Sequence, residues 1–235
     1  SDTPVTANVI YGAPEGQDAR ILAEQARASA KSQQVVIHIA LDDGRLETMR
    51  ELLEFFAPDV EIISFPAWDC LPYDRVSPQA EISAARMATL AALAAGLNGP
   101  FILLTTLNAA TQYVPPRDLL ASSACVATVG GRIDEKALRA FLVRMGYVQA
   151  PTVTEPGDYA VRGGIIDVWP PGEDAPVRLD LFGDMLDGAR RFDVGTQRTT
   201  EKLERVELAP VSEVILDDAA IARFRQNYRV EFGAG

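Results

Sequence analysis

Short apolar runs alternate with helix-spaced apolar positions along the first half of the chain. The runs are rich in β-branched and aromatic residues and lie at Val9–Tyr11, Val35–Ile39, Glu61–Phe65 and Phe101–Thr105. Helical spacing connects two further apolar sets: Leu46, Met49, Leu52, Leu53 and Phe56, and then Ile82, Ala85, Leu90, Leu93 and Leu97. Strands that alternate with helices are typical of a parallel sheet with flanking helices. The pattern therefore predicts an α/β domain over residues 1–116.

The pattern changes after Pro115 and Pro116. Strand-like runs then follow one another at 124–128, 159–162, 165–169, 177–182 and 190–193. A single helical pattern lies among them, with an apolar face formed by Leu138, Phe141, Leu142 and Met145. Asp187 and Gly188 tolerate positive φ and predict a hairpin turn. Residues 117–208 are therefore expected to form a small, largely antiparallel α+β domain inserted into the first domain.

The last segment, residues 209–235, is expected to leave this domain and return to the first sheet. A short helix from Asp217 to Arg225 and a strand from Tyr228 to Phe232 are expected there. The chain begins at Ser1 without a methionine and stops directly after the strand-like run. Both ends look cut, so the chain is expected to be a piece of a longer protein.

A glycine-containing loop follows the first expected strand, at the place where α/β domains bind phosphate. It holds Gly12 and Gly16 and leads into a helix expected from Asp18 to Lys31. A working phosphate loop needs a lysine and a Ser/Thr where this chain has Gln17 and Asp18. The acidic side chain also repels phosphate at the helix N-terminus. A nucleotide site and a simple tight turn are both conceivable, and the missing groups favour a degenerate loop that binds no nucleotide.

Composition narrows the class of function. The 235 residues include 22 Lys+Arg and 33 Asp+Glu, a net charge of −11, which is a poor basis for general nucleic-acid binding. No apolar run approaches the length of a membrane span, so a cytoplasmic protein without a membrane partner is expected. Cys70, Cys125 and the single histidine, His38, have no partners at metal-ligand or disulfide spacing. We expect no metal site, no cofactor and no catalytic residue in this chain.

One strand carries an unusual outer face. In Val177–Phe182, alternate residues share a face, so Val177, Leu179 and Leu181 face the core while Arg178, Asp180 and Phe182 face outward. An aromatic side chain beside an arginine on a solvated face is typical of protein interfaces. The alternative is a phenylalanine tucked under a loop, with a solvated arginine beside it.

A second arginine is expected near this face. Arg162 ends the neighbouring strand and is followed by Gly163-Gly164, which predicts a bulge or tight bend that aims the arginine to the same side. Further arginines at 190, 191, 198 and 205 are interleaved with acidic residues. This interleaving favours salt-bridged faces and protein contacts over a basic groove for nucleic acid.

Three long motifs follow one another along the chain: FPAWDCLPYDRVSP at 65–78, followed by Arg86 and Leu90; GDYAVRGGIIDVWP at 157–170; and FDVGTQRT at 192–199. Together they resemble the transcription-repair coupling factor family of bacteria. The resemblance covers essentially the whole chain, and three motifs in order make it specific. The region is similar in turn to the damage-verifying helicase UvrB, of which it looks like a degenerate copy. The resemblance implies UvrB-like domains 1a (1–116), 2 (117–208) and a truncated 1b (209–235).

The resemblance also implies a function. Members of the family displace RNA polymerase stalled at a lesion and recruit UvrA, while their motor, which uses ATP and magnesium and moves on DNA, lies in other domains. The family's UvrA contacts are two arginines and a phenylalanine, which fall by motif on Arg162, Arg178 and Phe182. Asp180, on the same face, is a further candidate. The resemblance further implies that the C-terminal region of the resting full-length protein masks this surface.

The sequence therefore predicts a protein-binding module of transcription-coupled nucleotide excision repair, not an enzyme. A rival hypothesis is an ATP-dependent DNA enzyme of the UvrB/helicase type, which acts on damaged DNA through the first domain. A third is a DNA-binding module, against which the net charge argues.

Overall fold

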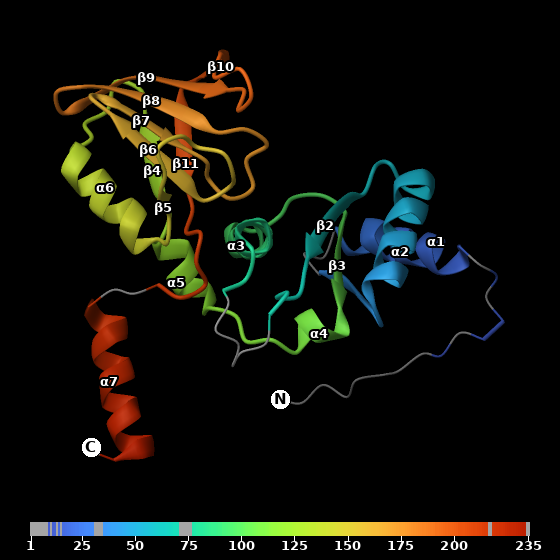
Figure 1. Ribbon diagram of the computed structural model, residues 1–235. Coiled ribbons are helices and arrows are strands. Elements are labelled where there is room, and N and C mark those ends of the chain that lie inside the picture. Colours follow the sequence, from blue (N-terminus) through green and yellow to red (C-terminus); the bar gives the residue numbers. More distant parts are fainter. Residues whose placement is uncertain are drawn as a thin grey trace. The chain divides into compact units, whose positions relative to one another are not determined.

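The chain forms two compact units, which are described separately. The computed structural model describes residues 9, 11, 12, 14, 16–30, 35–70, 77–215 and 218–233 (Figure 1). Unit 1 comprises Ser1–Phe65 and Leu97–Thr111, and unit 2 comprises Pro66–Gly96 and Gln112–Gly235. The expected α/β class is confirmed, because unit 1 holds a parallel sheet and unit 2 a largely antiparallel one.

Unit 1 is a three-stranded parallel sheet with two helices on one face (Figure 1). The strands, in the order β1-β3-β2, are β1 (Val36–Ala40), β3 (Phe101–Thr106) and β2 (Glu61–Phe65). The helices are α1 (Gln17–Ser29), α2 (Asp43–Phe56) and the short α4 (Leu107–Ala110). Alanines of α1 and Leu46, Met49 and Leu53 of α2 pack on Ile102 and Leu104 of the central strand. Burial of these apolar faces holds the helices on the sheet.

The expected strand at Val9–Tyr11 is not borne out by the residues that are described. Val9 and Tyr11 belong to no strand and are 66% and 87% exposed, and Ile10 lies outside the described residues. Three apolar residues gain little as a strand unless a sheet supplies backbone partners and a covering layer. The other three strands expected in the first half are confirmed.

Unit 2 is built around a six-stranded sheet with the order β10-β9-β8-β7-β6-β5. Its strands are β5 (Val148–Gln149), β6 (Asp158–Arg162), β7 (Ile165–Val168), β8 (Val177–Phe182), β9 (Met185–Phe192) and β10 (Thr199–Leu203). A separate antiparallel pair is formed by β4 (Cys125–Thr128) and β11 (Arg205–Leu208). Helix α6 (Glu135–Arg144) packs Leu138 and Leu142 against Ile166, Leu179 and Leu186 of the large sheet. One face of the sheet therefore packs on the core, and the opposite face carries the outward-facing residues of β8.

Helix α3 (Ala80–Ala95) groups with unit 2, together with α5 (Arg117–Ser122). The fully buried Arg86 explains this placement, because its Nε and Nη2 donate to the Glu213 carboxylate at 2.5 and 3.0 Å. Its Nη1 donates to the carbonyl of Pro66 and to Gln112, and Trp68 donates to Glu213 at 2.8 Å. A buried arginine has to be paired in this way. The sequence pattern assigns α3 to the first domain, whereas these contacts tie it to residues 66–68, 112 and 213.

Asp187 and Gly188 form a bulge and not the expected hairpin turn. Both lie inside β9, where Asp180 pairs with Gly188 and Leu181 with Leu186, so that Asp187 is the extra residue. The turn itself is Gly183-Asp184, between the paired Phe182 and Met185, with Gly183 at φ 62°. A bulge favours the same tolerant residues as a turn, which explains the wrong prediction.

The expected return strand at Tyr228–Phe232 is also wrong, because α7 (Asp218–Phe232) is one continuous helix. Ile221, Phe224 and Tyr228 recur at helical spacing, and the two aromatic rings lie 6.0 Å apart. Residues 228–232 alternate polar and apolar as a strand does, but they continue the helical period of 3.6 residues that begins earlier in α7.

The assignment of UvrB-like domains 1a, 2 and 1b stays a prediction. Within the described ranges, no helix combines the length and apolarity that a membrane crossing requires.

Candidate protein-interaction surface

Arg162 is placed by a tight two-residue turn between β6 and β7. Arg162 pairs with Ile165 across the turn, and Gly163 adopts φ 63°, which favours glycine. Gly164 accepts a hydrogen bond from the backbone N–H of Leu181 at 2.7 Å. A Cβ on Gly164 would lie 2.7 Å from the Leu181 carbonyl oxygen, so a side chain does not fit there. The glycine pair is therefore the tight bend that the sequence predicts, and it lets β8 approach closely.

Asp167 brings Arg162 and Arg178 together. Its side chain is 1% exposed, and Arg178 binds it in a bidentate manner, with Nε to Oδ1 at 2.7 Å and Nη2 to Oδ2 at 2.9 Å. Nη2 of Arg162 also donates to Oδ2. Charge-assisted and bidentate hydrogen bonds of this kind are strong and directional. Both guanidinium groups are consequently held by one buried carboxylate, with 49% of the Arg162 side chain exposed.

Arg178 is fixed from a second side as well. Its guanidinium carbon lies 4.7 Å from the centroid of the Phe192 ring, a cation–π geometry. The hydrogen bond with Asp167 raises the pKa of Arg178 above its usual value, and burial opposes this rise. Only 19% of the Arg178 side chain is exposed. Arg178 is therefore a preorganised cation.

Asp180 contacts a different arginine from the two that the sequence analysis singles out. Its carboxylate accepts a hydrogen bond from Nη1 of Arg190 on β9, which lies diagonally from Asp180 because Arg190 pairs with Arg178. Asp180 adds a favourable charge near Arg178, although no hydrogen bond joins the two side chains among those described. Orientation of the arginines is therefore the role of Asp167, whereas Asp180 orients Arg190.

Phe182 stands at the tip of the β8–β9 hairpin and is 81% exposed. Its cross-strand neighbour Met185 is 45% exposed. The alternative of a phenylalanine tucked under a loop is therefore wrong. Four residues of strand separate Phe182 from Arg178, roughly 13 Å. The structure thus brings Arg162 and Arg178 into one cluster. Phe182 lies apart from this cluster, as an exposed apolar side chain on the same sheet.

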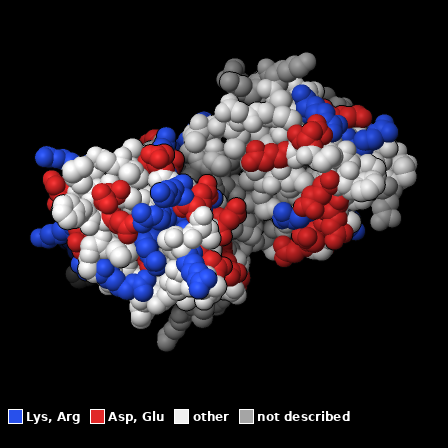
Figure 2. Space-filling model, turned by 90° about the horizontal axis from the view of Figure 1, so that it is seen from above, with Lys and Arg blue, Asp and Glu red and all other residues white. Residues whose placement is uncertain are grey.

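Cations outnumber carboxylates on this outer sheet face. One cross-strand row reads Ala160, Asp167, Arg178, Arg190 and Lys202, and the next begins with Arg162, Ile165 and Asp180. The two rows hold four cations and two carboxylates, a net +2 within a chain of net −11. Figure 2 shows blue and red side chains interleaved over the body that carries β8–β10. We call the outer-face side chains Arg162, Asp167, Arg178, Asp180, Phe182 and Arg190 the arginine face.

Two residues of this region are absent from the sequence-based candidates. Asp167 lies in an apolar strand opposite Arg178, and an acidic residue on the outer positions of Ile165–Val168 is the signal that points to it. Gln197 lies beside Arg162, Ile165 and Arg178 around a hollow of about 330 Å³. Nothing local marks Gln197, because its approach to Arg162 and Arg178 depends on the tertiary fold.

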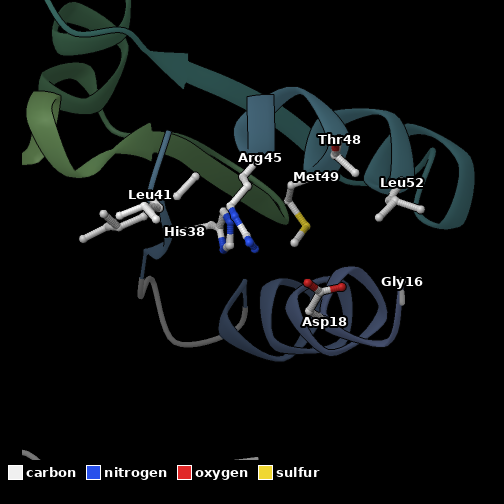
Figure 3. A pocket seen from close by; sticks show the side chains of 10 residues that line it. Gly16, Asp18, His38, Leu41, Arg45, Thr48, Met49 and Leu52 are labelled. Atoms are coloured by element: carbon white, nitrogen blue, oxygen red, sulfur yellow. The ribbon is translucent and has the colours of Figure 1, made fainter. Parts of the chain in front are cut away.

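The glycine-containing loop before α1 borders a different hollow, in unit 1, of about 690 Å³ (Figure 3). Gly16 precedes α1 with φ 82°, Gln17 begins the helix, and Gly12 is exposed with φ 69°. Asp18 is exposed and accepts a hydrogen bond from the backbone of Ala19 at 2.9 Å. Gly16 and Asp18 line the hollow at the start of α1, and the remaining walls come from β1, α2 and the residue Leu41 between them. Inability to bind nucleotide stays a prediction for this loop.

His38 and Arg45 also line this hollow (Figure 3). Burial lowers the pKa of His38, and the negative charge of Asp18 partly opposes that shift. Within the described residues, no three side chains of the metal-ligating types gather in one place. The groups around the loop are thus a carboxylate, an imidazole and a guanidinium from three different elements.

Comparison with known proteins identifies the region of the arginine face. A family model described as "UvrB interaction domain" matches residues 126–214, a range that contains Arg162, Arg178 and Phe182. The transcription-repair-coupling factor of Escherichia coli K12 is 37% identical over 198 residues, which is 84% of this chain and 17% of that protein. The Haemophilus influenzae factor is 34% identical over 99% of this chain and 20% of its own length. The Myxococcus xanthus factor is 36% identical over 78% of this chain.

The chain therefore spans about a fifth or less of the length of these relatives, while they cover most of its own length. The matches run across both units and include the arginine face. Residues 126–214 thus match the UvrB interaction domain, and most of the chain is homologous to one part of the transcription-repair-coupling factors.

Proposed function

We propose that this chain is a protein-binding module that docks UvrA and so links stalled transcription to nucleotide excision repair. The observation that carries the proposal is the geometry of Arg162 and Arg178, both bonded to the buried Asp167 within the UvrB interaction domain match. Guanidinium groups that are already oriented lose little side-chain freedom on binding. Such a surface is suited to recognition by a protein partner.

Phe182 supplies the apolar contact of the proposed interface. Binding energy concentrates in aromatic and arginine side chains that become desolvated, surrounded by contacts that exclude water. Phe182 and Met185 at the hairpin tip offer such an apolar anchor beside the polar cluster. In the proposal, Asp180 holds Arg190 in position between the Arg162–Arg178 cluster and the hairpin tip with Phe182.

The parent protein is proposed to be an ATP-dependent DNA translocase that displaces stalled RNA polymerase. ATP and magnesium then belong to its motor, and RNA polymerase and DNA contact domains outside this chain. The chain itself is proposed to contain no catalytic residue and to bind no cofactor. Masking of the arginine face by the C-terminal region of the resting parent would make UvrA docking conditional on engagement with polymerase.

Calorimetric titration of the chain with purified UvrA tests the proposal. We expect Arg162→Ala, Arg178→Ala and Phe182→Ala each to weaken binding by about 2 kcal/mol, the typical loss on truncating an interface anchor. Arg20→Ala is the control, because Arg20 lies on α1 in the other compact unit, with a side chain 63% exposed. Undiminished affinity in all three variants would contradict the assignment of the site, and absence of binding by the unaltered chain would contradict the function.

A further inference from the structure

A hollow on the arginine face has walls of carbon. It measures about 330 Å³ and is lined by Arg162, Ile165, Arg178 and Gln197. Three of these residues are polar, yet the surface that the four turn toward the hollow is almost entirely carbon. The hollow is therefore apolar, although the face around it is rich in charge. We call it the Ile165 socket.

The polar ends of the lining side chains are bonded to other groups. Arg178 directs Nε and Nη2 to Asp167, and Arg162 directs Nη2 to the same carboxylate. Gln197 donates from Nε2 to the carbonyl of Val194 at 2.8 Å, and its Oε1 is buried. Long polar side chains that turn their ends to such partners leave their methylene groups for apolar contacts. The carbon surface of the socket is the consequence.

The walls of the Ile165 socket are fixed by contacts within the chain. The guanidinium group of Arg178 is held by Asp167 and by the ring of Phe192, whose centroid lies 4.7 Å from the guanidinium carbon. Gln197 lies in a turn, where its backbone N–H donates to the carbonyl of Asp193 at 2.7 Å. A preformed hollow costs less free energy to fill, because fewer side chains have to be ordered on binding.

Ile165 connects the socket to the rest of the proposed interface. It pairs with Arg162 across the β6–β7 turn and with Asp180 on β8, and it is 36% exposed. Phe182 follows Asp180 by two residues on the same face, roughly 7 Å along the strand. Ile165 thus lies between the arginine cluster and the exposed phenylalanine, and a partner that contacts both covers it.

The socket favours an uncharged occupant. A carboxylate or an ammonium group that entered it would lose its water and meet no polar group on the walls, which costs free energy. An aliphatic side chain carries no such cost, and it gains free energy by leaving water together with the exposed part of Ile165. A volume of about 330 Å³ is at the lower end of known ligand pockets and suits one branched side chain of a partner.

We infer that UvrA inserts one aliphatic side chain, of the size of leucine or isoleucine, into the Ile165 socket. The methylene groups of Arg162 and Arg178 contact it, while their charged ends stay bonded to Asp167. The inference deepens the proposed function and rests on it, because it adds an apolar contact to the same interface. Ile165 becomes a contact residue beside the two arginines and Phe182.

Ile165→Val and Ile165→Thr test the inference in titrations with UvrA, because the two new side chains have nearly the same shape and differ in polarity. The affinity of Ile165→Val is expected to stay within about twofold of that of the unaltered chain, since the wall remains apolar. Ile165→Thr places a hydroxyl against the entering side chain, so we expect affinity about fivefold weaker than that of Ile165→Val. Both new residues favour strands, and melting temperatures check that both variants fold.

Ile165→Phe tests whether the hollow itself is used. The larger ring is expected to occupy the socket and to exclude the side chain of the partner, which weakens binding about tenfold or more. Ile37→Phe is the matched control, because Ile37 is an isoleucine on β1 in the other compact unit and is 52% exposed. Its affinity for UvrA is expected to be unchanged.

The order of the affinities decides the outcome. Binding by Ile165→Thr that is as tight as binding by Ile165→Val, or tighter, means that the occupant is polar and overturns the inference. Undiminished affinity of Ile165→Phe means that nothing enters the socket and also overturns it. If Phe182→Ala still weakens binding in either case, the docking function stands. Absence of binding by the unaltered chain contradicts the docking function and removes the inference with it.

Discussion

The loop before α1 and the arginine face differ in the side chains that could support a function. The loop keeps the glycines and the helix start of a phosphate site, but Gln17 and Asp18 stand where lysine and Ser/Thr are needed. The arginine face has no familiar loop motif, yet a buried carboxylate holds its arginines in position. A backbone arrangement does not by itself imply a function, so the function has to be argued from the side chains.

The same contrast appears in how each site is supported. Asp18 is exposed, and its side chain accepts a hydrogen bond from the backbone of its own helix. Asp167 is 1% exposed and contacts arginines from two strands. Removing the charge of Asp167 should consequently lower the free energy of unfolding by much more than removing the charge of Asp18.

The largest effect is expected for Asp167→Asn. This change leaves Arg162 and Arg178 without their shared counter-charge, and breaking a partly buried ion pair costs on the order of 3 kcal/mol of unfolding free energy. Urea unfolding followed by circular dichroism measures the change. Asp184→Asn is the control, because Asp184 is 69% exposed and pairs with Arg132 at 3.6 Å, so a change within about 0.5 kcal/mol is expected. Equal losses in the two variants would show that Asp167 is not the organising group.

The next effect is on binding alone. Phe182→Ala is expected to leave the unfolding free energy within about 0.5 kcal/mol, because the side chain is 81% exposed. UvrA affinity is expected to fall about 30-fold, the equivalent of about 2 kcal/mol. Phe55→Ala on α2 is matched in residue type and exposure, at 79%, and is expected to change neither quantity. A stability loss in Phe182→Ala comparable to its binding loss would assign the ring to folding instead.

The sequence alone predicts which side chains of β8 face outward, but it does not predict the contacts that hold those side chains in position. Alternation alone separates Arg178, Asp180 and Phe182 from the core residues of that strand, because the side-chain period of a strand is two. The link between Asp167 and Arg178 depends on the register of β7 against β8, which no local pattern encodes. The pairing of Asp180 with Arg190 has the same origin, since the bulge at Asp187 sets that register.

Element boundaries were misjudged where two local signals compete. Asp187-Gly188 suits a turn and a bulge equally, and the turn falls at Gly183-Asp184. Residues 228–232 alternate like a strand but extend a helix whose apolar positions begin earlier, at Ile221. Helix α3 was assigned by sequence order, whereas its place is decided by Arg86 and its long-range partner Glu213.

A smaller effect of pH is expected on the stability of unit 1, and it should come from His38 in the hollow beside the loop before α1. Burial lowers the pKa of His38, so the folded state binds its proton less readily than the unfolded state does. Protonation therefore favours unfolding, and the stability of unit 1 should fall as the pH drops below the ordinary histidine range. Urea unfolding at pH 7.5 and 5.5 should show a decrease that His38→Asn reduces. An identical decrease in the variant would mean that other groups cause it.

The smallest expected effect is that of ATP with magnesium, which should leave the melting temperature of the chain unchanged. A ligand that binds only the folded state stabilises it by RT ln(1 + [L]/Kd), so ATP at about 1 mM and a site with a Kd of about 0.1 mM would add about 1.4 kcal/mol. The chain lacks the lysine and hydroxyl that hold phosphate and magnesium, and Asp18 repels the anion at the start of α1. A rise in melting temperature that Asp18→Ala increases further would place nucleotide at this loop and favour the rival DNA enzyme. An unchanged melting temperature, in a chain that binds UvrA through Arg178, would support a structural role for the loop and a binding role for the arginine face.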